Sequence, residues 1–128
     1  MITTQSMFDY ATTVERLTRA ITEHGLSIFC RVDHALGARD VGLELQPEEV
    51  FMFGSPRAGT PLMQAAPAVG YELPLRILVW QDDSGVKLAY RDPRELADQF
   101  GLDDLRGTLD QMAVLLSALT AKVASSST

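Results

Sequence analysis

The chain has 128 residues, of which 46% are apolar, and its formal net charge is −6. This length suits one domain with a single core, and the negative charge disfavours nucleic acid and anionic membrane surfaces as partners. The one cysteine, Cys30, cannot form an internal disulfide. Residues 1–10 lack the basic flank and apolar run of an export signal, and no apolar run approaches the roughly 20 residues of a membrane span. We therefore expect a cytoplasmic protein with no nucleic-acid or membrane partner.

The first two predicted elements are an edge strand and an amphipathic helix. Residues 2–10 alternate loosely and are rich in threonine and aromatic residues, which favours a strand. Thr12 and Glu15 have the spacing of a capping box, and Gly25 stands where a left-handed residue ends a helix. The pattern therefore predicts a helix over residues 13–24.

Two further strands and a short connection are predicted next. Residues 27–33 alternate with period two, although Phe29 makes the second face of this strand partly apolar as well. Residues 34–40 are short and alanine-rich, which indicates a turn of helix or an irregular loop. Residues 50–53 form an apolar run of strand length that ends at Gly54, as expected of a central strand.

A short helix and a hairpin are predicted in the following segment. Thr60 before Pro61 has the pattern of an N-cap followed by a first-turn proline, and residues 62–66 can continue that helix. The runs 75–82 and 86–91 flank a short polar loop, which predicts a β-hairpin.

Two helices are predicted in the last part of the chain. Asp92 before Pro93 is expected to cap a short helix that Gly101 closes. Asp103 and Asp104 favour the positive pole of a long final helix. Its apolar stripe recurs at intervals of three and four residues, at Leu105, Leu109, Met112, Leu116, Leu119 and Val123.

Together these elements predict an α+β fold. A mostly antiparallel sheet of about five strands needs one face covered, and two main helices packed on that face are the simplest way to cover it. Short helical turns occupy the connections. We expect residues 1–124 to form a single domain and residues 125–128 to be a frayed C-terminal tail.

Several segments of the chain resemble an uncharacterised family catalogued as DUF302. The most specific is residues 53–64, FGSPRAGTPLMQ, and the resemblance extends over roughly residues 8–119. The family more often has asparagine in place of Ser55 and commonly has lysine in place of Arg57. Shorter similar segments lie at residues 32–35, 42–45, 73–75, 79–82 and 90–93.

This resemblance implies a fold and an assembly but no reaction. The implied topology is β-α-β4-α, similar to that of the TATA-binding protein, and the implied assembly is a homodimer. Likeness to a DNA-binding fold does not indicate DNA binding, because function depends on the site and not on the fold.

The first candidate site is the segment from Gly54 to Met63. Its glycines and prolines fix a tight backbone path into a helix N-terminus, where free N–H groups and the positive end of the helix dipole favour an anion. Arg57 supplies charge and Thr60 a hydroxyl, and the N–H groups of Leu62 and Met63 form the cradle. The predicted ligand-binding residues are Gly54, Ser55, Arg57, Gly59, Thr60, Leu62 and Met63.

A purely structural interpretation accounts for the same residues. Glycine and proline shape a turn, Thr60 caps the helix, and Arg57 pairs with Glu48 or Glu49. Large apolar residues nearby either line a pocket between sheet and helices or belong to the core, which is the commoner place for them. They are Phe51, Met52, Phe53, Met63 and Trp80.

The second candidate site is the pair Asp33 and His34. A histidine beside a carboxylate at a strand end suits an acid/base pair, or a metal ligand together with Cys30. Two ligands do not make a tetrahedral site, so we predict no metal. In the structural interpretation His34 donates a hydrogen bond that holds the next loop, and Cys30 is a buried small apolar residue.

The sequence leads to three hypotheses of function. The first is a homodimeric module that binds a small anionic or polar ligand at the segment 54–63. The second is an enzyme that uses His34 as acid or base, with Asp33 orienting it. The third is a structural or regulatory module whose exposed sheet face or final helix binds a partner. No nucleophile motif, zinc spacing or dinucleotide fingerprint is present, so we predict no cofactor and favour binding over catalysis.

Overall fold

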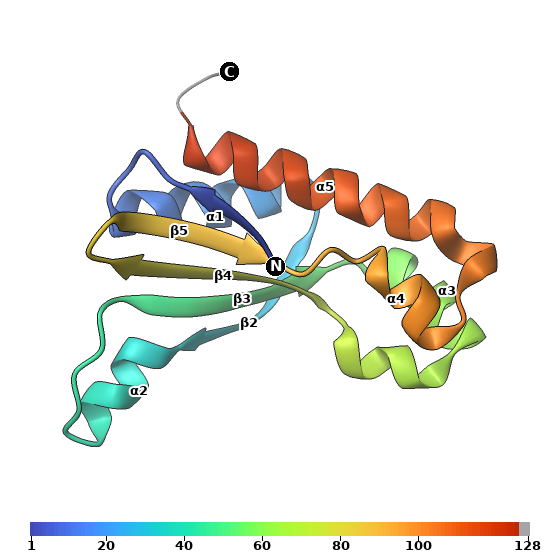
Figure 1. Ribbon diagram of the computed structural model, residues 1–128, viewed down its shortest axis with the longest axis horizontal. Helices are drawn as coiled ribbons and strands as arrows, with labels where there is room; N and C mark the ends of the chain where they lie inside the picture. Colours follow the sequence, from blue (N-terminus) through green and yellow to red (C-terminus); the bar gives the residue numbers. More distant parts are fainter. Residues whose placement is uncertain (126–128) are drawn as a thin grey trace.

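The computed structural model describes residues 1–125, which form one antiparallel sheet and the helices around it (Figure 1). The five strands lie in the order β1-β5-β4-β3-β2, and every neighbouring pair is antiparallel. The elements in chain order are β1 (Ile2–Gln5), α1 (Tyr10–Glu23), β2 (Ser27–Asp33), α2 (His34–Asp40), β3 (Glu48–Gly54), α3 (Pro56–Ala65), the 3₁₀ helix η1 (Pro67–Glu72), β4 (Leu75–Asp82), β5 (Gly85–Tyr90), α4 (Glu95–Phe100), the 3₁₀ turn η2 (Asp103–Leu105) and α5 (Arg106–Ala124). The predicted α+β architecture is confirmed.

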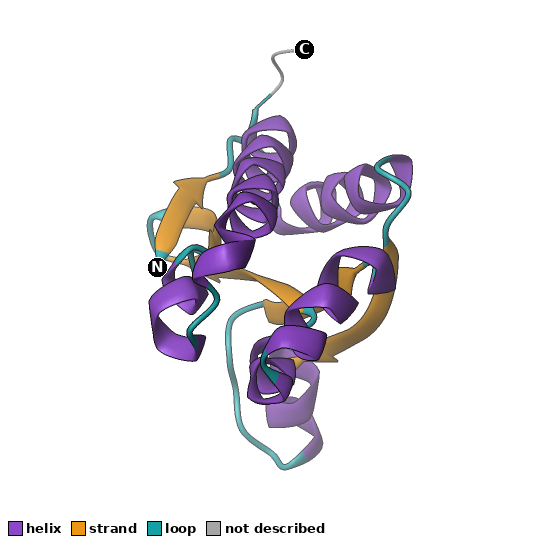
Figure 2. Cartoon of the chain, turned by 90° about the vertical axis from the view of Figure 1, so that its right-hand side faces the viewer, coloured by secondary structure: helices purple, strands orange, loops and turns teal. Residues whose placement is uncertain are grey.

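The main core lies between the sheet and the two long helices. Helices α1 and α5 cover the same face of the sheet, as Figures 1 and 2 show from two directions. Alternate residues of β3, such as Phe51 and Phe53, point into this layer and are fully buried, and Leu17 and Ile21 of α1 meet them there. Burying a side chain of this size contributes about 1.5–3 kcal/mol, so this layer supplies much of the stability. The predicted stripe on α5 is buried from Leu109 onward.

A second, smaller core lies beyond one end of the sheet. Helices α3, η1 and α4 gather there beneath the first half of α5 (Figure 1). Their buried side chains, among them Leu62 of α3 and Val69 of η1, pack with Leu109 and Met112 of α5. This end of the molecule carries the candidate site.

The N-terminal strand is shorter than predicted and the first helix is longer. β1 ends at Gln5 and α1 begins at Tyr10, whereas the sequence predicted a strand over residues 2–10. The N-cap is Asp9, whose carboxylate accepts a hydrogen bond from the backbone N–H of Thr12 at 2.8 Å. Asp9 therefore takes the capping role that the sequence had assigned to Thr12.

Helix α3 also begins earlier than predicted. Its N-cap is Ser55 and its first residue is Pro56, so Thr60 and Pro61 lie inside the helix and not at its start. Ser55 before Pro56 and Thr60 before Pro61 both fit the pattern of a hydroxyl N-cap followed by a first-turn proline. Ser55 is the cap because β3 ends at Gly54, which pairs with Ser27 of β2, and the chain turns directly after that pairing.

The end of the chain follows the prediction with two shifts. The hairpin β4–β5 and the left-handed Gly101, with φ of 67°, are confirmed. The carboxylate of Asp92 accepts a hydrogen bond from the N–H of Arg94 in the turn before α4, but it does not cap that helix. Asp103, Asp104 and Leu105 form η2, and α5 begins after them, at Arg106. Of the predicted tail, residues 126–128 lie outside the described residues.

Strand β2 lies at one edge of the sheet and contains a bulge. The pairing with β3 shifts between Ile28 and Cys30, so Phe29 is the extra residue of the bulge. Cys30 was predicted to be buried, but it is exposed. It pairs with Met52, whose neighbours Phe51 and Phe53 point into the helix-covered core, so Cys30 points to the face of the sheet opposite α1 and α5.

Candidate functional site

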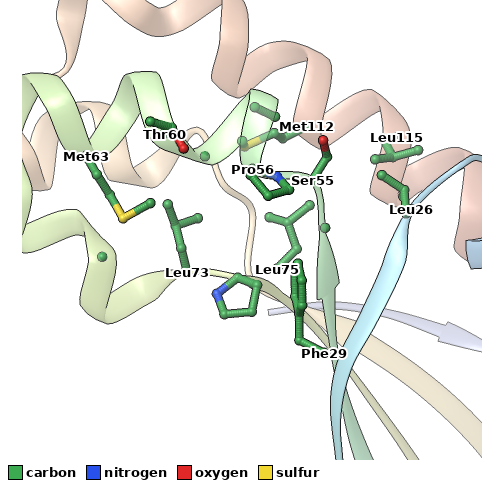
Figure 3. Close-up of a pocket in the computed structure, with 15 residues that line it drawn as sticks. Leu26, Phe29, Ser55, Pro56, Thr60, Met63, Leu73, Leu75, Met112 and Leu115 are labelled. Atoms are coloured by element: carbon green, nitrogen blue, oxygen red, sulfur yellow. The ribbon is translucent and has the colours of Figure 1, made fainter.

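A pocket of about 330 Å³ opens between α3 and the sheet end (Figure 3). Met63 and Leu73 stand on one side of it, and Leu26 and Leu115 on the other. Segments far apart in the sequence therefore build it together: the ends of β2 and β3, helix α3, the stretch from η1 to β4, and α5. The lining residues are Leu26, Phe29, Gly54, Ser55, Pro56, Ala58, Gly59, Thr60, Met63, Gly70, Leu73, Pro74, Leu75, Met112 and Leu115.

The lining is almost wholly apolar. Leucine, methionine, proline and phenylalanine side chains supply most of it, and no charged side chain among residues 1–125 contributes. The polar side chains are Ser55 and Thr60, each with one hydroxyl. Such a lining suits an uncharged ligand, because a charged group placed there loses its water and gains no ion partner.

Three glycines in the walls keep the pocket open. A methyl group added at Gly59 would lie 3.6 Å from a Leu73 methyl and 3.8 Å from the Met63 methyl, which are ordinary contacts. At Gly70 the same addition would lie 3.2 Å from the Met63 sulfur, which is tight. Gly54 borders Pro74 and Phe29. Side chains at these positions would occupy space that is now empty.

The bulge of β2 brings Phe29 to the mouth of the pocket. As the extra residue of the bulge, Phe29 has no partner in the register with β3, and the residue remains 54% exposed. A regular strand would have continued the alternation of residues 27–33 through this position. The bulge thus converts a strand residue into part of the pocket wall.

The structure brings most of the predicted ligand-binding residues together, but in a different arrangement. Gly54, Ser55, Gly59, Thr60 and Met63 line the pocket. The other two predicted residues do not line it: Leu62 is fully buried in the smaller core, and Arg57 is exposed.

The expected anion cradle at Thr60 is wrong in its geometry. Thr60 and the residues after it lie within α3, so their N–H groups point along the helix and not into an open pole. At the true N-terminus, the Ser55 hydroxyl accepts from the N–H of Arg57 at 3.3 Å. The Ser55 carbonyl accepts from Ala58 and Gly59 at 3.1 and 3.2 Å. The protein's own oxygens therefore occupy this pole.

The expected pairing of Arg57 with a strand carboxylate is also wrong. Glu49 is 6% exposed and holds Arg31 instead, with Nε to Oε2 at 2.5 Å and Nη2 to Oε1 at 3.2 Å. The Arg31 guanidinium also lies over the Phe51 ring, 4.7 Å from its centroid. The hydrogen bond to Glu49 raises the pKa of Arg31. Desolvation by burial, together with the Glu49 charge, raises the pKa of Tyr10. The Arg31 and Glu49 charges therefore pair with each other and not with Arg57.

Asp33 and His34 do not form an acid/base pair at this pocket. The Asp33 carboxylate accepts from the Leu36 N–H at 2.9 Å and caps α2, and His34 is the first residue of that helix. Asp33 pairs with Glu49, whereas Gly54 pairs with Ser27 at the other end of β3. The two ends are five residue steps apart along β3, or about 17 Å. Among the described residues, Asp33 and His34 therefore do not share the pocket at the Gly54 segment.

Comparison with known proteins identifies the family. The model of the family described as a domain of unknown function, DUF302, matches residues 2–123. The chain belongs to the DUF302 family. A crystal structure of an uncharacterized conserved DUF302 protein from Bacillus stearothermophilus has the same fold, with a TM-score of 0.86, 18% identity and 97% coverage of both chains.

Curated relatives of this DUF302 chain are longer proteins. It is 42% identical over 103 residues to the fluoride-specific ion channel FluC 1 of Brucella suis biovar 1. The same identity relates it to FluC 2 of Brucella melitensis biotype 1. These matches cover 80% of this chain but only 41% and 38% of the relatives. The chain thus spans about two fifths of the length of the curated relatives it matches.

Residues 1–125 of this DUF302 chain contain neither a membrane-spanning helix nor a cluster of metal-binding side chains. Within that part of the chain, no helix has the length and hydropathy needed to span a membrane. Among the same residues, histidine, cysteine, aspartate and glutamate side chains form no group of three that could hold a metal ion.

Sequence reasoning missed most of the pocket walls of this DUF302 chain. Phe29 alone gave a signal, as an apolar residue on the polar face of its predicted strand. Most of the other missed residues are ordinary apolar residues of helices, strands and loops, and only the fold shows that they face an empty space. They include Leu26, Leu73, Leu75, Met112 and Leu115.

Proposed function

We propose that this DUF302 chain is a binding module for a small, uncharged, mainly apolar molecule, which occupies the pocket beside α3. The observation that carries the proposal is Gly59, a glycine inside a helix at a position where alanine would fit. The proposal keeps the predicted segment 54–63 as the binding segment and changes the ligand from an anion to a neutral molecule.

Gly59 is hard to explain by folding alone. Its backbone is helical and not left-handed, so no glycine conformation is required. A glycine within a helix costs about 0.5–1 kcal/mol relative to alanine, and an alanine Cβ here meets only ordinary contacts. The absence of a side chain therefore lowers stability and enlarges the pocket, which is the combination expected where a ligand needs the room.

Pocket size and lining support a ligand of one to three rings. Ligand sites commonly measure about 300–1,000 Å³ and combine apolar walls with a few polar groups. This pocket lies at the small end of that range, at about 330 Å³, and has two hydroxyls. A carboxylate or phosphate is a poor fit, because none of the described residues that line the pocket has a cationic side chain to balance its charge.

A neutral fluorescent probe tests the proposal directly. N-phenyl-naphthylamine brightens when it leaves water for an apolar site, so titration with purified protein reports occupancy of the pocket. The variant Gly59→Leu places a side chain in the pocket and should weaken binding about tenfold or more. Gly37→Leu is the matched control, because Gly37 is likewise the fourth residue of its helix and an added Cβ there meets nothing within 4 Å.

Three results would contradict the proposal. They are no brightening with the unaltered protein, unchanged binding by Gly59→Leu, or an equal loss of binding in the Gly37→Leu control. Circular dichroism of both variants checks that helix content is retained.

The curated relatives suggest a second candidate function. A segment 42% identical to this chain occurs within proteins named fluoride-specific ion channels, where it makes up about two fifths of the sequence. We propose that the DUF302 chain can act as an accessory module of such a channel. Adding the purified chain to liposomes that hold the Brucella suis relative without its matched segment should change the rate of fluoride efflux. An unchanged rate would contradict this role.

The homodimer that the family resemblance implies stays a prediction. Light scattering of the purified chain at several concentrations measures its mass and so tests the prediction.

A further inference from the structure

The hydroxyl of Thr60, like that of Thr108 in α5, lacks the backbone hydrogen bond that several other helical threonines of this chain make. The hydroxyls of Thr13, Thr22 and Thr120 donate to backbone carbonyls three or four residues earlier, at 2.8–2.9 Å. For Thr60, no side-chain hydrogen bond to any of residues 1–125 is present. Figure 3 shows its oxygen turned from α3 toward the pocket. An otherwise apolar pocket thus contains one hydroxyl that is free to serve a bound molecule.

The second hydroxyl of the pocket already has a structural role. Ser55 caps α3 and accepts from the N–H of Arg57 at 3.3 Å, which fixes its side chain at the helix start. The Thr60 hydroxyl has no capping role, so it is the better candidate for recognition of a polar group on the ligand.

The apolar walls favour an aromatic ring as the body of the ligand. Phe29 presents a half-exposed ring at the mouth of the pocket, and Met63 and Met112 contribute thioether side chains. Sulfur–aromatic contacts and offset ring pairs each stabilise a bound aromatic ring beyond simple burial. A cavity of about 150 Å³ holds benzene, so about 330 Å³ leaves room for two fused rings.

We infer that the pocket selects a neutral aromatic molecule that carries one hydroxyl or carbonyl oxygen, with the rings against Phe29 and the methionines and the oxygen at the Thr60 hydroxyl. This inference rests on the proposed function, since it assigns the chemistry of the ligand for that same pocket. Thr60 is then the residue that determines specificity, and the apolar walls supply most of the affinity.

Three probes of equal ring size separate the contributions of the rings, the oxygen and a charge to binding. Naphthalene has the rings alone, naphthol adds a hydroxyl, and naphthoate adds a charge. Isotope-labelled methionine methyl groups report binding by nuclear magnetic resonance. The signals of Met63 and Met112 should shift, whereas those of Met7 and Met52, which do not line the pocket, should stay unchanged.

The expected order of affinity is naphthol above naphthalene above naphthoate. One net hydrogen bond makes a difference of about fivefold. Thr60→Val has the same shape without the hydroxyl, so it should lower the affinity for naphthol to that for naphthalene and leave naphthalene binding unchanged. Thr22→Val is the matched control, because Thr22 lies on α1 and does not line the pocket; this variant should bind all three probes as the unaltered protein does.

The possible outcomes separate this inference from the proposed function. If naphthalene and naphthol bind equally well and Thr60→Val changes neither affinity, the assignment of Thr60 is overturned while the apolar pocket stands. If naphthoate binds most tightly, both the neutral ligand class and the Thr60 assignment are overturned. If none of the probes shifts Met63 or Met112, the proposed function is overturned together with the inference.

Discussion

Arg16 fixes the end of the last helix to the first helix, and its removal is the sharpest test of how this fold is held together. From the middle of α1, its Nε donates to the carbonyl of Val123 at 2.9 Å. Its Nη2 donates to the carbonyls of Lys122 and Ser125 at 2.8 Å each. The guanidinium also lies 4.3 Å from the centroid of the Phe8 ring.

These contacts satisfy backbone groups that a helix leaves without partners. The last four carbonyls of any α-helix lack intrahelical donors, and a cation is favoured at that negative pole. Hydrogen bonds from a charged donor contribute about 1.5–3 kcal/mol when buried, and less where water can replace them, as at Lys122. With the ring contact, worth about 0.5–1 kcal/mol, we expect Arg16→Met to lower the free energy of unfolding by about 2–3 kcal/mol.

Chemical denaturation and thermal melting measure this loss, which for a chain of this size corresponds to about 10 °C in Tm. Methionine keeps the apolar stem of the side chain, so the loss reports the guanidinium. Arg19→Met is the control, because Arg19 lies on the same helix and forms only an exposed ion pair with Glu15. That change should cost about 0.5 kcal/mol or less. Equal effects of the two substitutions would refute the reasoning.

Two predictions concern the pH dependence of stability. The Lys87 ammonium and the hydroxyl and N–H of Ser84 hold the pKa of Asp82 well below its ordinary value. The stability from this carboxylate is therefore present above the unfolded pKa of about 3.9 and is lost as the pH falls below it. Asp82→Asn should accordingly flatten the curve of unfolding free energy against pH in acid. A curve of unchanged slope would contradict this prediction. Burial and then the Glu49 charge raise the pKa of Tyr10. Stability from its neutral form is present below the unfolded pKa of about 10 and is lost above it. The Tyr10→Phe variant should therefore resist alkaline unfolding better than the unaltered protein, as measured by circular dichroism. Equal alkaline sensitivity of the two proteins would contradict burial as the cause of the raised Tyr10 pKa.

Local patterns in the sequence determined most of the secondary structure. The hairpin of β4 and β5, the alternation of β2 and the apolar stripe of α5 each depend on residues a few positions apart. Turn chemistry and periodicity therefore identify them without knowledge of the rest of the chain. The fold class followed, because one apolar sheet face and two amphipathic helices have few ways to pack.

Only the tertiary structure decided where α3 begins and what its residues face. Ser55 and Thr60 are both hydroxyl residues before proline, and the choice between them depends on where β3 stops pairing with β2. The pocket depends on contacts between elements that the sequence pattern treats separately, and Arg16 reaches a carbonyl 107 residues away. The sequence by itself thus determined the elements and singled out the segment 54–63. The chemistry of that segment, an apolar pocket in place of an anion cradle, was set by long-range packing, which no local pattern encodes.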